Sequence, residues 1–299
     1  MSDDRPTHSD GESNDEPGLI AARYPDGSLT YPAHDLGPAD VDHLLVTHPH
    51  VDHIGQLPAV LTDGEPTVYA PAGVRERFAR DPSELAARVR RNATAAGFPE
   101  EQREMAVDMA VESLERNSDL LAPDVVDVWI EPGDTTAVGH LEVGAVHVPG
   151  HQADHLAYPV ELGGESALFA GDMAIEPFRS VSLHDGLDDG HREAVDAFYA
   201  ALDRLAGLDV DRVYPGHGRV HRDLQGVVRR DRESLDARLD AVRDLVADGH
   251  ETAAEVAFAL AGDRDVEYII PEAMAALTHL ESTGAVSVEL VDGVRRYDA

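Results

Sequence analysis

Three histidines and an aspartate are crowded into the stretch THPHVDHIGQ, residues 47–56. Imidazole nitrogens and carboxylate oxygens are ligands that Zn²⁺ and related transition metals accept in proteins. A histidine-rich loop can also be an ordinary surface feature, so its interpretation depends on ligands elsewhere in the chain. Three further residues follow apolar runs beside a glycine: His151 in VPGH, Asp172 in FAGD and His217 in YPGH. Because side chains at such turns project from a sheet edge into a cleft, the four segments together predict a metal centre.

The four segments resemble the HxHxDH motif and the later His, Asp and His of the metallo-β-lactamase superfamily. The matching residues are His48, His50, Asp52, His53, His151, Asp172 and His217. The resemblance covers roughly residues 18–220 and implies an α+β fold, an αββα sandwich with metals at the strand ends. The order of helices, metal domain and C-terminal segment is most similar to the glyoxylase-like branch of that superfamily.

The resemblance also implies how the ligands divide between two metals. One metal is held by His48, His50 and His151, the second by Asp52, His53 and His217, and Asp172 bridges both. Two Zn²⁺ ions are the expected cofactors, although Fe and Mn accept the same sulfur-free ligand set. Two ions that share a water lower its pKa and yield a metal-bound hydroxide near neutral pH. Asp52 is the candidate catalytic residue, because it could orient that hydroxide and move its proton.

This chemistry predicts a dinuclear zinc-dependent hydrolase that cleaves a small ester or thioester. Two alternatives stay open. One is a metal-dependent endoribonuclease of the same superfamily. The other is a mononuclear iron dioxygenase of persulfides, whose family uses only positions like those of His48, His151 and Asp172. The complete second set, with His53 and His217, favours two metals. His155 is expected beside the site and not as a ligand.

Charge is the most unusual property of the composition. The 299 residues include 58 acidic side chains and 24 basic ones, all of them arginine, for a formal net charge of -34. The acidic residues are spread along the whole chain, which we interpret as an adaptation to high internal salt, as in halophiles. Such a charge repels nucleic acid and anionic membranes at low salt. We expect a small-molecule substrate and no membrane partner, while a nucleic-acid partner is disfavoured but left open.

Cysteine is absent, which excludes disulfides, thiolate metal ligands and a cysteine nucleophile. Hydrophobic residues make up 42% of the chain, enough for a sizeable core. No apolar run approaches the roughly 20 residues of a membrane span, and the N-terminus lacks an apolar signal core. A cytoplasmic protein is therefore the default expectation.

The chain divides into three expected regions: a disordered acidic arm at 1–17, a metal domain at 18–221 and a winged-helix-like domain at 222–299. Short apolar runs predict strands at 43–47, 66–71, 125–130, 141–150, 166–172 and 211–215. Helical patterns predict an insertion at 81–121, either a lid over the metals or ordinary packing, and a helix at 192–207. The Asp-Thr-Gly turn that usually precedes the metal loop in this superfamily is missing, so we expect reduced first strands or a start further upstream.

The last region has its own pattern. It predicts helices at 224–246, 252–262 and 271–284, then a hairpin that turns at Asp292-Gly293. Three helices and a hairpin are typical of a winged helix. However, residues 231–299 carry 16 acidic residues against 6 arginines, and 271–284 carries no arginine, which makes a poor nucleic-acid face. We expect this region to serve packing or dimerisation, with a homodimer as one outcome.

Overall fold

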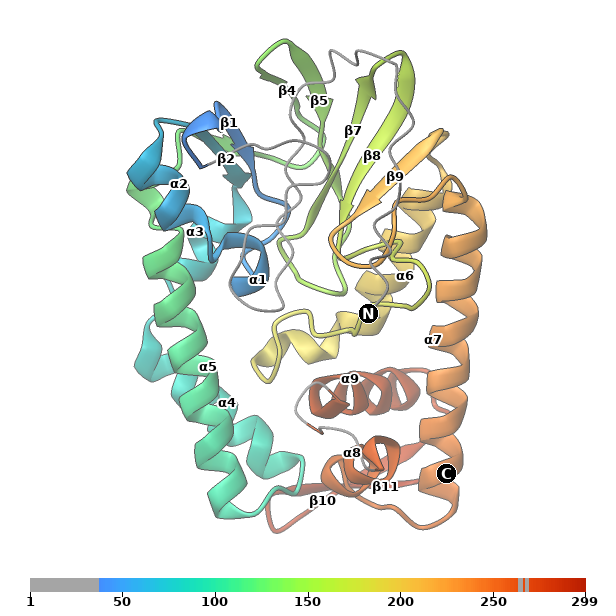
Figure 1. The fold of residues 1–299 in the computed structure, drawn as a ribbon. Helices are drawn as coiled ribbons and strands as arrows, with labels where there is room; N and C mark the ends of the chain where they lie inside the picture. The colour runs from blue at the N-terminus through green and yellow to red at the C-terminus, as the bar shows by residue number, and fades with distance from the viewer. Residues whose placement is uncertain (1–37, 263–265, 267–268) are drawn as a thin grey trace, which may run out of the picture.

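The computed structural model describes residues 38–262, 266 and 269–299 (Figure 1). The expected acidic arm at 1–17 lies outside the described residues, as does the chain up to residue 37. The described chain contains two sheets that carry the candidate site, and a separate two-stranded hairpin near the C-terminus. Short 3-10 turns connect larger elements at η1 (Pro38–Asp40), η2 (Pro123–Val125) and η3 (Asp189–Arg192).

The first sheet has three parallel strands in the order β1-β2-β3. These strands are β1 (His43–Leu45), β2 (Thr67–Pro71) and β3 (Val128–Ile130). The second sheet has the order β4-β5-β7-β8-β9, with β6 paired to β7. Its strands are β4 (Thr135–Val138), β5 (Leu141–Gly144), β6 (Val146–His147), β7 (Leu156–Leu162), β8 (Glu165–Gly171) and β9 (Arg212–Pro215). Strands β8 and β9 run parallel, so both end at the same edge of the sheet.

The buried side chains are arranged in layers. The outer face of the first sheet packs against α1 (Val51–Ile54), α2 (Leu57–Asp63) and α3 (Gly73–Phe78), with Val68 in that cluster. A second cluster, with Tyr69 and Tyr158, lies between the two sheets. A third joins Leu168 and Val213 of the second sheet to α6 (Ala194–Ala206) and α7 (Leu224–Ala247). This order of helix, sheet, sheet and helix is the αββα sandwich that the resemblance implies.

The insertion at 81–121 is a pair of helices, α4 (Pro82–Ala95) and α5 (Glu100–Leu120). Asp81 caps α4 by accepting hydrogen bonds from two backbone N–H groups, as predicted. Val89 of α4 and Val107 of α5 are buried between the two helices. Ordinary packing of one helix on the other therefore accounts for their facing apolar sides. Met105 and Met109 are exposed, so this packing does not account for them, and the lid over the metals stays a prediction.

The C-terminal region contains α7, three further elements and a final strand. These are α8 (Ala253–Ala261), α9 (Ile269–Ser282), β10 (Ser287–Val291) and β11 (Val294–Asp298). Thr252 and Glu255 form the predicted capping box of α8. Asp292 and Gly293 both have positive φ angles, 52° and 83°, as a two-residue hairpin turn requires.

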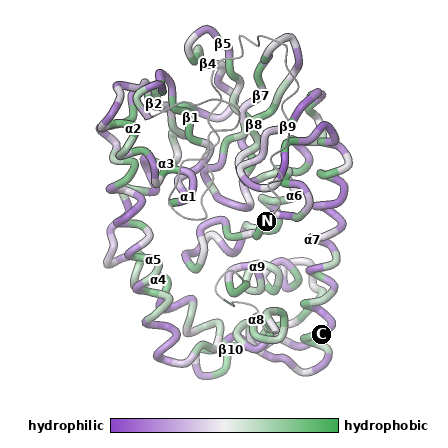
Figure 2. The backbone as a smooth tube through the Cα atoms, viewed as in Figure 1, coloured by the Kyte–Doolittle hydropathy of each residue, from purple (hydrophilic) through white to green (hydrophobic). Residues whose placement is uncertain are grey.

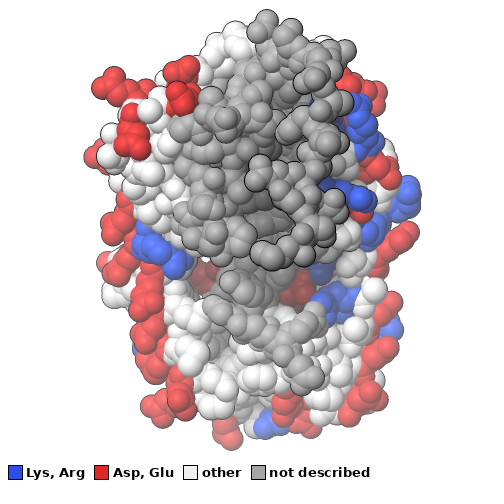
Figure 3. Space-filling view, in the orientation of Figure 1, with Lys and Arg blue, Asp and Glu red and all other residues white. Residues whose placement is uncertain are grey.

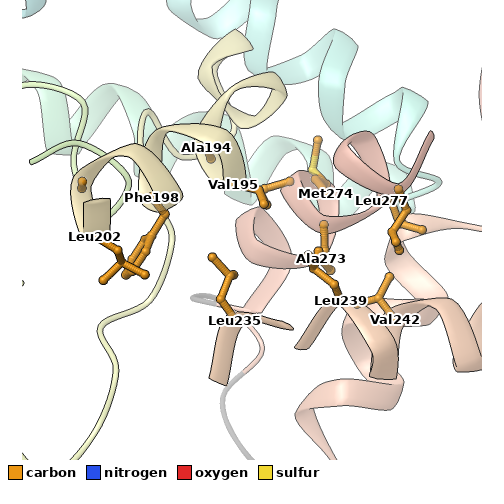
Figure 4. Close-up of a cluster of buried hydrophobic side chains, with 14 of the residues drawn as sticks. Ala194, Val195, Phe198, Leu202, Leu235, Leu239, Val242, Ala273, Met274 and Leu277 are labelled. Carbon is orange, nitrogen blue, oxygen red and sulfur yellow. The ribbon is translucent and has the colours of Figure 1, made fainter. Parts of the chain in front are cut away.

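The apolar faces of α7 and α9 are buried within the chain. Figure 4 shows them against α6. The labelled side chains come from three helices: Ala194, Val195, Phe198 and Leu202 of α6, Leu235, Leu239 and Val242 of α7, and Ala273, Met274 and Leu277 of α9. In Figure 2 the tube of α7 alternates between hydrophilic and hydrophobic residues, while α9 carries longer hydrophobic stretches. The C-terminal helices therefore share one core with the second sheet and with α6.

The surface is dominated by acidic side chains. Figure 3 shows them on both flanks of the visible face, with arginines gathered at fewer places. This distribution matches the even spread of acidic residues along the sequence. Among the described residues, no helix is both long enough and apolar enough to cross a bilayer.

Candidate metal centre

The candidate metal centre forms where four loops meet at the ends of strands. The first loop follows β1, the second follows β6, and the others follow the parallel strands β8 and β9. Gly216 N donates to Gly171 O at 2.6 Å, which joins the last two loops. Leu156 N donates to Thr47 O at 3.0 Å, which ties the histidine-rich loop to the start of β7. The topology thus collects residues that are far apart in the sequence.

Two glycines are required by close approaches within this site. Gly171 has a φ of +51°, and a Cβ there would lie 2.4 Å from His155 Nε2. A Cβ on Gly216 would lie 2.4 Å from Asp172 Oδ1. Any other residue would therefore displace the side chains that it neighbours. The glycines next to Asp172 and His217 make room for the site.

A first group of ligand atoms comes from His48, His50, His151 and Asp172. His50 Nδ1 lies 3.0 Å from His48 Nε2 and 3.1 Å from His151 Nε2. His151 Nε2 lies 3.2 Å from Asp172 Oδ2. The ligand atoms of this group all lie within 4.8 Å of one another, close enough to surround a single cation.

A second group comes from Asp52, His53, His217 and, again, Asp172. His217 Nε2 lies 3.0 Å from Asp52 Oδ2 and 3.3 Å from Asp172 Oδ2. His53 Nε2 lies 3.1 Å from Asp172 Oδ1. Although these two atoms are 3.1 Å apart, both are buried and neither forms a hydrogen bond, with the other or with any other described residue. Burying such atoms is costly unless something compensates them, and a cation between them would do so.

The electrostatics of the site also suit a cation. Burial, together with neighbouring imidazoles, lowers the pKa of His48 and His50 well below the usual value. Burial lowers the pKa of His151 as well. These rings are therefore neutral at physiological pH and keep a lone pair for a metal. Burial alone would raise the pKa of Asp172, but His217 and His53 hold it well below its usual range.

Two neighbours orient the ligands without belonging to either group. His155 Nε2 accepts a hydrogen bond from Asp172 N at 3.0 Å, and its ring stacks on His48 at a centroid distance of 4.6 Å. His151 Nδ1 lies 2.9 Å from Val181 O. Because a carbonyl oxygen can only accept a hydrogen bond, Nδ1 carries the ring proton and Nε2 is left as the ligand atom. Because Val181 contributes a backbone carbonyl, its side chain gives no sequence signal.

The structure brings all seven predicted ligand residues into these two groups, with Asp172 shared. It places His155 beside the site, as expected. The sequence analysis missed the segment from Met173 to His184, whose backbone supplies the Val181 carbonyl. His184 N also donates to Gly150 O at 3.0 Å and to His151 O at 2.9 Å. Two buried residues of this segment, Ala174 and His184, have positive φ angles, a feature that is visible only in the structure.

Comparisons with known proteins agree with this geometry. The family model described as the metallo-beta-lactamase superfamily matches residues 13–217. A thioesterase of Emericella nidulans is 25% identical over 279 residues, which are 89% of this chain and 63% of that protein. An atrochrysone carboxyl ACP thioesterase of Cryptosporiopsis sp. is 32% identical over 123 residues, 38% of this chain and 34% of that protein. The chain thus spans between about a third and two thirds of these relatives.

A solved structure is similar over most of the described fold. It is a metallo-beta-lactamase family protein from Thermus thermophilus, with a TM-score of 0.69 and 26% identity. The similarity covers 88% of this chain and 81% of that one. It therefore extends beyond the sandwich into the C-terminal region.

Proposed function

Because the chain belongs to the metallo-β-lactamase superfamily, we propose that it is a dinuclear metal-dependent hydrolase of a small ester or thioester. The observation that carries the proposal is the pair of four-residue ligand groups that share Asp172. In this proposal His48, His50 and His151 hold one ion, Asp52, His53 and His217 hold the other, and Asp172 contacts both. Zn²⁺ is the preferred ion, since its usual ligands are of these types, while Fe and Mn accept the same set.

The bound ions would supply Lewis acidity and would lower the pKa of a shared water. The chain's own contribution to the reaction is centred on Asp52. Its side chain is partly exposed, in contrast to that of Asp172, so it can meet both solvent and substrate. Burial tends to raise its pKa, but His217 and His53 lower it below its usual value, so Asp52 is a carboxylate at neutral pH. It can therefore orient a water molecule and accept its proton.

The choice of substrate class is supported by the names of relatives. Two of the fungal proteins similar to this chain are thioesterases. Their names describe proteins that are longer than the matched segments, so ester or thioester cleavage is a proposal for this chain. Three further proposals rest on the sequence alone: a cytoplasmic location, an adaptation to high salt and a winged-helix-like domain at 222–299.

An RNA substrate is the weaker alternative. In a winged helix that binds nucleic acid, one helix must lie open to the groove. Here α9 is buried along most of its first half, including Ala273, Met274 and Leu277. The mononuclear iron dioxygenase is also a weaker alternative. Its family binds one metal, and a second set of ligands such as Asp52, His53 and His217 would have no role there. A homodimer stays a prediction, but the apolar faces that suggested it are buried within the chain.

The proposal is tested by metal analysis and a substrate panel on the full-length protein in high-salt buffer. We expect about two equivalents of zinc per chain and turnover of an ester or a thioester. One equivalent of iron with no zinc would contradict the dinuclear proposal. Cleavage of RNA, with no turnover of esters, thioesters or lactones, would contradict the proposed substrate class.

A further inference from the structure

The loop between β8 and η3 carries a contact that sets the orientation of His151. Val181 O lies 2.9 Å from His151 Nδ1 and is its acceptor. A carbonyl acceptor at one ring nitrogen fixes the tautomer and turns the other nitrogen toward the metal. Whatever holds the backbone at Val181 therefore also holds His151.

Arg179 holds that backbone from two residues away. Its Nη1 donates to Ser180 O at 2.8 Å, and its Nε donates to Ser234 Oγ of α7 at 3.3 Å. The guanidinium lies over the ring of Phe198 at 5.4 Å from the centroid. Its Nη2 also pairs with Glu272 of α9. Arg179 thus joins the loop to three helices.

Glu272 is a buried carboxylate between two guanidinium groups. Its side chain is only 5% exposed and that of Arg179 is 6% exposed. The second partner is Arg238 of α7, whose Nε lies 3.1 Å from Glu272 Oε2. The neighbouring residues Ala273 and Met274 pack into the core shared with α6 and α7, so the carboxylate stands on a fixed helix (Figure 4). Removing one member of a buried ion pair leaves the other charge uncompensated.

The first half of the same loop has a separate attachment. Arg230 of α7 donates to Ile175 O at 2.6 Å and to Phe178 O at 3.2 Å. Its Nη1 also lies 2.8 Å from Glu176 Oε2. Loss of the Arg179 contact would therefore loosen the segment next to Val181, although Ser182 Oγ still lies 3.4 Å from Gly150 O and 3.5 Å from Ala194 O. The segment nearer to Asp172 stays attached to Arg230.

We propose that Glu272 is a positioning residue for the metal centre. Through Arg179 it fixes the backbone at 179–181, and through the Val181 carbonyl it fixes His151. The C-terminal helices then contribute to metal affinity although they supply no ligand. The inference rests on the proposed function only in that His151 holds a metal, and it is independent of the substrate.

The test compares the zinc affinity of metal-stripped, full-length variants by competition with a chromophoric chelator. Glu272→Gln keeps the shape of the side chain and removes its charge. We expect about 10- to 100-fold weaker zinc binding, the usual effect of losing a partner that orients a ligand. Leu277→Ala is the matched control, because it loosens α9 without touching the loop. It should lose thermal stability and keep its zinc affinity.

A second variant separates positioning from stability. Arg179→Met combined with Glu272→Met replaces the buried pair with apolar side chains, which often restores stability. Arg238, which loses its contact with Glu272, is 21% exposed and can turn to solvent. It should still bind zinc more weakly than the wild type, because the contacts of Arg179 with Ser180 O, Ser234 Oγ and Glu272 are then lost and the backbone at 179–181 is held less firmly. Recovery of full affinity with stability would overturn the proposal, as would unchanged affinity in Glu272→Gln.

The same experiment distinguishes this inference from the proposed function. Tight zinc binding by the wild type with no effect of Glu272→Gln would overturn the positioning role alone. Absence of tight zinc binding in the wild type would overturn both. Neither outcome depends on a measurement of substrate turnover.

Discussion

The two ligand groups of the metal centre differ in how far they are buried. His48 is fully buried, and the side chain of His151 is 8% exposed. In the other group, the side chains of Asp52 and His217 are 32% and 34% exposed. Asp172, which is 7% exposed, belongs to both. The first group therefore lies deeper than the second, although His50 is partly exposed and the side chain of His53 is only 11% exposed. We call the first group the buried half and the second the open half.

This difference separates two tasks. The buried half offers neutral imidazoles that are fixed by His155 and by the Val181 carbonyl, so it is built to hold an ion. The open half places a carboxylate, Asp52, where water and substrate arrive. We therefore expect changes in the buried half to affect metal content, and changes in the open half to affect turnover first. Four predictions test this contrast.

The largest effect is expected for Asp172→Ala, because Asp172 contacts both groups. Without it the two sets of histidines lose their shared carboxylate, and both ions should be lost. Activity should fall to the level of the buffer reaction. Elemental analysis of the purified variant measures the metal content directly.

Asp188→Asn is a suitable control, since Asp188 is a buried acid outside both ligand groups that pairs with Arg80 and Arg88. It should keep both metals. Retention of full metal content in Asp172→Ala would mean that this carboxylate does not bridge the two halves.

Asp52→Asn is expected to keep the ion of the buried half and lose turnover. Loss of a residue that moves a proton costs about 10²- to 10⁴-fold in rate. The amide also weakens the open half as a metal site, so we expect between one and two equivalents of metal. Steady-state kinetics beside elemental analysis would check both. Near-normal turnover would remove Asp52 from the mechanism.

The grouping of these seven side chains could be predicted because the residues have local signatures. His48, His50, Asp52 and His53 stand at fixed short spacings, and Asp172 and His217 each follow a strand and a glycine. The partners that orient these ligands have no such signature. Val181 acts through a backbone atom, and Arg179 meets Glu272 across 93 positions of sequence.

The fold was predicted in outline, and its gaps have physical causes. Strand β7 was missed because Pro159 interrupts its pattern, yet β7 lies inside the second sheet. Its pairing with β5 is at Val160, and its pairing with β6 is at Ala157 and Leu156. Pro159 lies between these pairings. It has no backbone N–H, and at this position none is needed for a hydrogen bond to β5 or β6. The helices α1, α2 and α3 are too short for periodicity to reveal them.

Strand boundaries differ from the predicted ones for local reasons. The run 141–150 forms two short strands, β5 and β6, because the chain leaves the ladder at Ala145. Ala145 N donates to Asp134 O, which stands opposite it in the register of β4 and β5, but Ala145 O accepts from Gly133 N, so the pairing becomes irregular there. The run 125–130 begins with the 3-10 turn η2, so only Val128–Ile130 pairs as β3. A continuous apolar run does not reveal such breaks.

The two halves should also release their ions in a definite order. The exposed side chains of Asp52 and His217 give a chelator access to the open half, while His48 lies in the interior. We expect the first equivalent of metal to leave severalfold faster than the second during dialysis against a chelator. The time course of metal content, beside that of activity, measures this. Activity should fall with the first equivalent, and release of both ions in a single phase would contradict the contrast.

The smallest effect is expected in the protonation of the metal-free protein, where the halves should respond to pH in opposite directions. Contacts with Asp172 and Asp52 raise the pKa of His217 to about 10, whereas burial lowers that of His48 and His151. An unfolded histidine titrates near 6.5. The raised pKa of His217 thus stabilises the fold fully below about pH 6.5, and this contribution is lost as the pH rises toward 10. For the buried histidines the sign is reversed, so their contribution is lost as the pH falls below about 6.5.

Nitrogen NMR of the metal-free protein at pH 8 measures this difference at each ring. His217 should be protonated on both nitrogens, while His48 and His151 should be neutral. Adding zinc should remove the second proton from His217, since a ligand nitrogen cannot keep its proton. Metal binding should therefore release protons from the open half and scarcely any from the buried half. A His217 that is neutral at pH 8 before zinc is added would show that its carboxylate contacts are too weak to distinguish the halves.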